Sequence, residues 1–284
     1  MRGAGVVAVH ALQEALRRRV FLVVLALTVV FLGLFWLGAW KAFEEAENQA
    51  SPVLGVDTDT VVGSTLFGLA MFGTLFLGVV LGVFLTLGAV RGDAERGLLQ
   101  PLVVRPLGRP AFLAGRLLGA VAVCVPYVFA VYALAAVITR SAGGWWPDQF
   151  VAPGLELAGA ATMLAALSLL GSVVLSSTAN GIAVFMLYGA GLVAGLLGQI
   201  GEALGSDTLR SVADTTAWFL PFEALYQDAL HRITADTHGL TEFVVELGPF
   251  GGAQPASAGQ LAWTAAYLAL VAAAAAAAFA RRDL

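Results

Sequence analysis

The sequence predicts an all-helical integral membrane protein with six transmembrane helices, and three observations lead to that prediction. Of the 284 residues, 59% are hydrophobic and 12% are charged, which is about half the charged fraction of a soluble domain. Apolar runs of about 20 residues, long enough to cross the hydrocarbon core, recur along the whole chain. These runs lack the apolar–polar alternation expected of strands in a membrane barrel.

Residues 1–284 are expected to form a single transmembrane domain, because the apolar runs leave no stretch for a soluble one. Val6–Arg19 comes first, and it fits either a short amphipathic helix at the membrane surface or a plain basic flank. The second and third spans are longer than a crossing needs, so we expect them to tilt or to project into water. The spans are predicted at residues 20–40, 61–90, 111–138, 155–175, 182–200 and 260–280.

Basic residues are distributed unevenly between the two sides of the predicted bundle. Residues 1–19, the loop 91–116 and the C-terminal residues hold 11 of the 15 lysines and arginines, but only 4 of the 19 acidic residues. Basic residues close to span ends remain in the cytoplasm. Both termini and the loop 91–116 are therefore predicted to be cytoplasmic.

Three segments fall on the opposite, outer side. Residues 41–60 are acidic, and residues 140–154 contain Trp145 and Trp146, which suit a membrane–water boundary. The longest, residues 201–259, contains the apolar stretch Trp218–Tyr226, which is too short to cross the membrane. We interpret this stretch as a re-entrant or surface-lying helical element, broken at Pro221. On the cytoplasmic side, residues 176–181 are predicted to form a tight turn.

The chain shows no catalytic motif. It has no His-Glu-x-x-His helix, no Gly-x-Ser-x-Gly elbow and no Gly-x-x-x-x-Gly-Lys-Ser/Thr phosphate loop. The spans are almost free of ionisable residues, and Glu156 is interpreted as an interfacial carboxylate at a span end. His231 and His238, with Asp228 and Asp236, are interpreted as a solvated outer loop, and no metal site is predicted.

Small residues predict close helix contacts. Three glycine pairs have the small-x-x-x-small spacing that allows two helices to approach closely, and this pattern fits packing within the chain or a subunit interface. Pro126 lies inside the third predicted span and is expected to bend it. The paired glycines are Gly78 and Gly82, Gly115 and Gly119, and Gly191 and Gly195.

Several segments occur in an order that resembles a known family. They are Gly88–Gln100, Val104–Pro110, Leu113–Gly119, residues 176–181 and Leu220–Tyr226. In this order the chain resembles the permease subunit of ABC-2-type ABC transporters, particularly the single six-span permeases. Leu98 stands where that family usually has Thr, Arg116 replaces a Lys, and Glu223 stands where an Asp is frequent. The outer re-entrant element of the family would correspond here to Pro221, Glu223 and Tyr226.

The resemblance implies a division of labour between subunits. Two permease subunits, either two copies of this chain or one copy with a related permease, would pair with separate nucleotide-binding subunits. Those partners would bind ATP and Mg²⁺, so this chain would hold no cofactor and would not itself be an enzyme. The complex would move a substrate outward across the cytoplasmic (inner) membrane.

The same resemblance implies a coupling helix near Asp93–Leu102 that rests on the ATPase. The charged side chains of this loop can form charge-assisted hydrogen bonds with a partner, and its prolines stiffen the connection. The implied ATPase contacts are Asp93, Glu95, Arg96, Gly97, Arg105, Pro106 and Arg109.

Two other readings fit the same sequence. One is a membrane scaffold or anchor that works without an ATPase. The other is an ABC complex that transmits force to an extracytoplasmic partner, with residues 201–259 as the docking surface. Neither a membrane enzyme nor a nucleic-acid-binding protein is indicated.

Overall fold

The computed structural model describes residues 19–49, 55–89, 109–248 and 253–281, and every regular element in these ranges is a helix. The all-helical prediction is therefore confirmed. The predicted N-terminal amphipathic segment, Val6–Arg19, lies outside the described residues except for Arg19, where α2 begins. The helices are α2 (Arg19–Gln49), α3 (Thr58–Thr86), α6 (Arg109–Gly143), α7 (Val151–Val174), α8 (Ser177–Leu204), α9 (Asp207–Phe219), α10 (Phe222–Arg232), α11 (Leu240–Glu246) and α12 (Ala258–Ala280).

Six of these helices are long and apolar enough to cross a membrane: α2, α3, α6, α7, α8 and α12. Their bounds differ from the prediction mainly where a helix continues into polar sequence. α2 runs on to Gln49 and α6 to Gly143, so the loop before α7 is only residues 144–150. α3 ends at Thr86 rather than at residue 90. α6 has 35 residues and continues through Pro126, which corresponds to about 52 Å and exceeds the hydrocarbon thickness.

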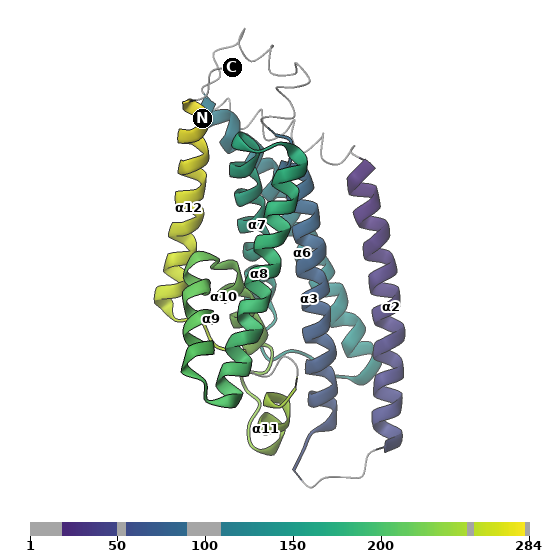
Figure 1. The fold of residues 1–284 in the computed structure, drawn as a ribbon. Helices are drawn as coiled ribbons and strands as arrows, with labels where there is room; N and C mark the ends of the chain where they lie inside the picture. The colour runs from purple at the N-terminus through teal and green to yellow at the C-terminus, as the bar shows by residue number, and fades with distance from the viewer. Residues whose placement is uncertain (1–18, 50–54, 90–108, 249–252, 282–284) are drawn as a thin grey trace.

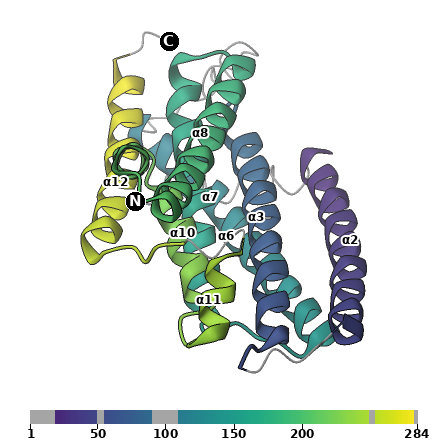
Figure 2. The same ribbon diagram turned by 60° about the horizontal axis from the view of Figure 1, so that its bottom comes forward.

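The centre of the bundle is formed by α3, α6 and α7, and α2 and α12 stand at opposite edges (Figures 1 and 2). In α7, 72% of the most apolar window is buried, whereas in α2 and α12 only 17% is buried. The outer face of α2 exposes large side chains such as Val29, Leu34 and Trp36. An exposed apolar face of this length suits contact with lipid rather than water.

One end of the bundle contains the connection between α7 and α8, and we call it the 175–176 end. The predicted tight turn at residues 176–181 is wrong, because only Leu175 and Ser176 are non-helical and α8 already begins at Ser177. The reason is local: the Ser176 Oγ caps α8 by accepting from the Ala179 N–H at 3.4 Å, and the Ser176 carbonyl accepts the first helical hydrogen bond, from the Asn180 N–H at 2.9 Å. The buried Asn180 amide then donates to the Ser168 carbonyl at 2.8 Å and so fastens α8 to α7.

The opposite end, which we call the 144–150 end, is packed with aromatic rings. Trp145 is only 8% exposed and lies 5.7 Å from the Phe67 ring centroid. Gly63 makes room for it, because a Cβ there would lie 2.4 Å from the Trp145 ring. Trp146 is more exposed and stacks on Phe150 at 4.9 Å. The two tryptophans therefore differ: Trp145 belongs to the core, and Trp146 suits the membrane boundary.

Candidate functional site: a helical hairpin inside the bundle

The chain between α8 and α12 folds back into the bundle as a helical hairpin. α9 runs upward beside α8 and α10 returns between α8, α7 and α12 (Figure 1). The two helices are separated at Leu220 and Pro221, so the break predicted at Pro221 is present. Proline has no N–H to continue a helix but suits a helix start. The predicted helical element before the last span, broken at Pro221, is therefore present, and its re-entrant or surface-lying placement in the membrane stays a prediction.

The tip of the hairpin reaches deep along α8. Phe222 is fully buried, and its ring lies 5.9 Å from the Tyr188 ring of α8. A Cβ on Gly191 would lie 2.4 Å from the Phe222 ring, so the glycine is what allows this contact. Gly191 is 13 positions before Leu204 at the end of α8, a depth of about 20 Å at 1.5 Å per residue. The hairpin thus enters from the 144–150 end and runs for about 20 Å along α8.

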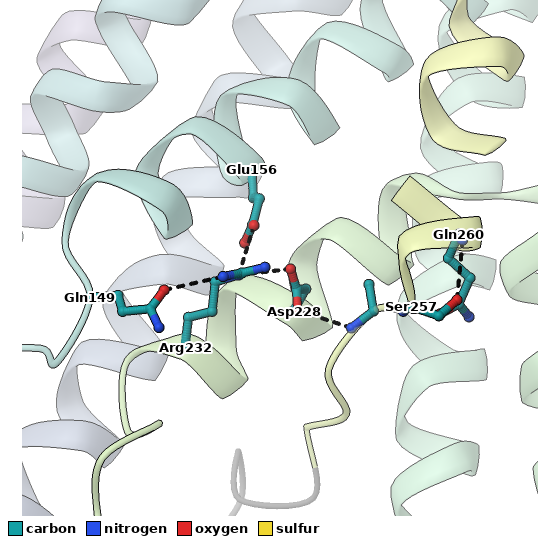
Figure 3. Close-up of polar contacts among 7 residues, drawn as sticks. Gln149, Glu156, Asp228, Arg232, Ser257 and Gln260 are labelled. Atoms are coloured by element: carbon teal, nitrogen blue, oxygen red, sulfur yellow. Dashed lines mark hydrogen bonds and ion pairs between the residues drawn. The ribbon is translucent and has the colours of Figure 1, made fainter. Parts of the chain in front are cut away.

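Arg232, near the end of α10, fastens the hairpin to α7 through two acids (Figure 3). Its Nε lies 2.9 Å from Glu156 Oε1 of α7 and 2.8 Å from Asp228 Oδ2 of α10. Its Nη1 donates to Gln149 Oε1 at 3.1 Å. The Glu156 and Asp228 side chains are only 12% and 2% exposed, so this is a largely desolvated ion network rather than a surface pair.

The same network reaches α12. Asp228 Oδ1 accepts from the N–H of Ala256, two residues before α12 begins, at 2.9 Å (Figure 3). Ser257 and Gln260 then form a reciprocal capping box that starts this helix. The hydrogen bond from Arg232 to Asp228, more than any other contact, raises the pKa of the guanidinium. Because a buried ion pair is costly to break on one side, Arg232 holds α7, α10 and the start of α12 in one arrangement.

This network was missed in the sequence. Glu156 lies near the start of α7, which agrees with its interpretation as a carboxylate at a span end, but its pairing with Arg232 is not evident in the sequence. The interpretation of Asp228 as part of a solvated loop is wrong. Asp228 is only 1% exposed. The spacing of Asp228 and Arg232, four positions apart on one helix, was the available signal for their pairing. The partnership with Glu156, 76 positions away from Arg232, has no local signature.

The three residues singled out on the outer element, Pro221, Glu223 and Tyr226, are all buried. Glu223 is 6% exposed, and its Oε1 has no hydrogen-bond donor among the described residues. Burial raises the pKa of Glu223 to about 7, and the neighbouring Gln227 amide opposes that shift. The Tyr226 hydroxyl also lacks a partner among the described residues, and its pKa is raised, mainly by burial.

The six glycines singled out for helix contacts are all buried. A Cβ on Gly78 would lie 2.5 Å from Val128 of α6, and one on Gly82 would lie 3.1 Å from the Ala165 Cβ of α7. Gly191 and Gly195 face the hairpin in the same way. Gly115 and Gly119 lie on the buried side of α6. The structure thus places four of the six against neighbours in the same chain.

The implied ATPase contacts lie almost entirely outside the described residues. Asp93, Glu95, Arg96, Gly97, Arg105 and Pro106 fall within residues 90–108, and Arg109 is the first residue of α6. Their assignment to coupling therefore stays a prediction.

The fold defines a multi-pass helical membrane protein with a hairpin inserted before its last span. The comparison with curated proteins gives no match for this chain. A family model described as ABC-2 family transporter protein matches residues 6–284. The chain therefore belongs to the ABC-2 transporter family, as a membrane-spanning permease component.

Proposed function

We propose that this chain is the permease half of an ATP-driven exporter in the cytoplasmic membrane, working with a separate nucleotide-binding subunit. The observation that carries the proposal is the family match over residues 6–284 of a chain with six membrane-crossing helices. The whole sequence lacks a phosphate loop, so the energy source is expected to be another subunit. Two copies of this chain, or one with a related permease, would complete the channel.

The arrangement of the helices agrees with this proposal. The C-terminal ends of α3 and α12 and the N-terminal end of α6 lie at the 175–176 end (Figure 1). The arginine distribution predicts that this end is cytoplasmic. The connection between α3 and α6 would then face the cytosol, where an ATPase could contact it.

The folded hairpin also favours transport over docking. Residues 222–232 pack between α7 and α8, and eight residues of α10 are buried, although α9 has no buried residue. A segment used chiefly to hold an extracytoplasmic partner would be expected to expose its side chains. A hairpin deep between spans suits a gate or a lining of the transport path.

The proposal is tested by replacing Glu95 and measuring transport, ATP hydrolysis and membrane insertion separately. The assay uses the chain co-expressed with its nucleotide-binding subunit. Glu95→Arg is expected to uncouple ATP hydrolysis from transport and to leave insertion intact, because the reversed charge would repel a complementary surface. Glu47→Arg is the matched control, since Glu47 is an exposed acid at the 144–150 end. Normal transport by Glu95→Arg would show that Glu95 has no coupling role.

Co-purification tests the wider proposal. We expect a nucleotide-hydrolysing subunit to remain bound to this chain after mild detergent extraction. A chain that inserts correctly but is isolated without any ATPase, under every extraction condition that preserves its fold, would favour the scaffold or anchor reading.

A further inference from the structure

A cavity of about 300 Å³ lies between α8, α9, α10 and the segment that leads into α12. This volume is at the lower limit of small-molecule pockets. Unlike the apolar bundle around it, the cavity is lined by several polar side chains, with small residues between them. These polar side chains include Gln199, Arg210, Asp214, Glu223 and Gln227.

Two glycines of α8 let the hairpin bring polar side chains close to this helix beside the cavity. A Cβ on Gly195 would lie 2.0 Å from Glu223 Oε1 and 2.7 Å from Gln227 Nε2. A Cβ on Gly198 would lie 3.0 Å from the Ala213 Cβ of α9, so α8 and α9 approach closely here. The glycine face of α8 therefore allows a carboxyl group and an amide to be held inside the protein without an opposing side chain.

One carboxylate oxygen of Glu223, Oε1, is a buried acceptor that the described residues leave without a donor, whereas Glu156 and Asp228 share Arg232. A buried carboxyl group without a donor or counter-charge is costly. The cation that lines the same cavity, Arg210, has a side chain that is 44% exposed and lies 3.9 Å from Asp207. With Asp214 also in the lining, the cavity has more negative than positive charge.

The glutamine side chains in the cavity add an amide oxygen that can accept a hydrogen bond. Gln199 Nε2 donates to Gln227 Oε1 at 3.1 Å, which occupies the Gln227 carbonyl. The carbonyl oxygen of Gln199 is not needed for that bond and can accept from a ligand. A carboxylate and an amide carbonyl together favour a ligand group that is positively charged and has N–H donors.

We propose that this cavity binds the protonated primary amine of a small ligand, with the Glu223 carboxylate as its counter-ion. An ammonium group provides up to three N–H donors for Glu223 and Gln199. A quaternary ammonium has the same charge but no N–H, so it leaves these acceptors unsatisfied. The amine can belong to a soluble molecule or to a lipid headgroup, because the hairpin exposes Trp218 and Phe219 close by.

Binding can be measured on the full chain in lipid nanodiscs, without nucleotide and without an ATPase subunit, so its outcome is independent of the proposed function. In phosphatidylcholine nanodiscs, ligand-observed NMR is used to titrate ethanolamine and, separately, choline. We expect ethanolamine to bind at about millimolar concentration and choline to bind about tenfold more weakly or worse. Glu223→Gln is expected to lose about tenfold or more in ethanolamine affinity, because it removes the counter-charge.

Glu242→Gln is the matched control, since Glu242 is an exposed acid on α11, and it should bind ethanolamine as the unmodified chain does. The melting temperature of each variant, measured in the same nanodiscs, separates loss of binding from loss of fold. Equal affinity of Glu223→Gln and the unmodified chain would overturn the proposal. So would equal affinity for ethanolamine and choline, or the absence of ethanolamine binding up to about 10 mM.

The same titration in nanodiscs that contain phosphatidylethanolamine identifies the source of the amine. If phosphatidylethanolamine in the nanodiscs abolishes ethanolamine binding, the headgroup occupies the cavity. If ethanolamine binds equally well in both lipids, the ligand is a soluble amine. Both results support an amine site, and the Glu223→Gln comparison decides whether that site exists.

Discussion

Arg232→Met is the substitution that should most directly loosen the hairpin. Arg232 lies within 3 Å of both Glu156 and Asp228, whose side chains are 12% and 2% exposed. Methionine keeps much of the volume but leaves both acids without their cation. Removing one partner of a buried ion pair costs about 3–5 kcal/mol, and because Arg232 is itself 28% exposed, we expect the lower end, about 3 kcal/mol.

That loss corresponds to a measurable change in melting temperature. With a melting entropy of about 2.1 cal/mol/K per residue over 284 residues, about 3 kcal/mol lowers the melting temperature by about 5 °C. The assay is thermal unfolding of the purified chain in nanodiscs, followed by intrinsic tryptophan fluorescence. Arg210→Met is the matched control, because its pairing with Asp207 is long and exposed, and it should change the melting temperature little.

The network argument fails if Arg232→Met and Arg210→Met melt at the same temperature. A second variant distinguishes ionic from packing effects. Adding Glu156→Gln and Asp228→Asn to Arg232→Met removes the uncompensated charges, so part of the lost stability should return. A triple variant that is less stable than Arg232→Met alone would indicate that the acids stabilise the hairpin without the cation.

Three further predictions concern the hairpin and the topology. Gly195→Val should displace α10 and lower the melting temperature by several degrees, because the new Cβ would lie 2.0 Å from Glu223 Oε1. Gly189→Val on the same helix is the control and should be tolerated, because no atom lies within 4 Å of a Cβ at that position. Burial raises the pKa of Glu223 from 4.5 to about 7. Between these two pH values the folded state keeps the Glu223 proton while the unfolded state loses it, so the free energy of unfolding should fall as the pH rises from 4.5 to about 7, by at most about 3 kcal/mol. Glu223→Gln should remove that part of the pH dependence, as thermal unfolding at about pH 5 and about pH 8 would show, and an unchanged pH profile would contradict the burial argument. Gly97→Cys should react with membrane-impermeant thiol reagents only from the cytoplasmic side, against a low background because the single native cysteine, Cys124, is buried; labelling from outside would reverse the topology.

The six spans were readable in the sequence because a bilayer demands a long apolar helix at each crossing. The ends of the helices at the 144–150 end could not be predicted from the sequence, because a helix does not need to end where the membrane ends. α2 continues through Glu44 and Glu45 to Gln49 in the described structure. Hydropathy detects where the apolar stretch stops, while the backbone hydrogen bonds of the helix continue beyond it.

The hairpin was partly predictable. Pro221 marks the break between α9 and α10 through its own chemistry, which acts within a few residues. Where the hairpin would lie was not predictable, because that depends on Gly191 and Gly195 of α8 accepting Phe222 and Glu223. The pairing of Arg232 with Glu156 follows from that placement. Contacts that join distant segments are decided by tertiary packing, and the residues that make them show no common local pattern.

The hairpin is attached to two spans by two different kinds of contact. To α8 it is joined by shape, through the glycine notches at Gly191 and Gly195. To α7 it is joined by shape at Gly159, where a Cβ would lie 3.2 Å from Leu225, and also by charge, through one guanidinium with several acceptors within reach. In a sliding motion the ion pairs could exchange partners, whereas glycine notches fit in a single register. The notches on both spans would therefore make α7, α8 and the hairpin move together.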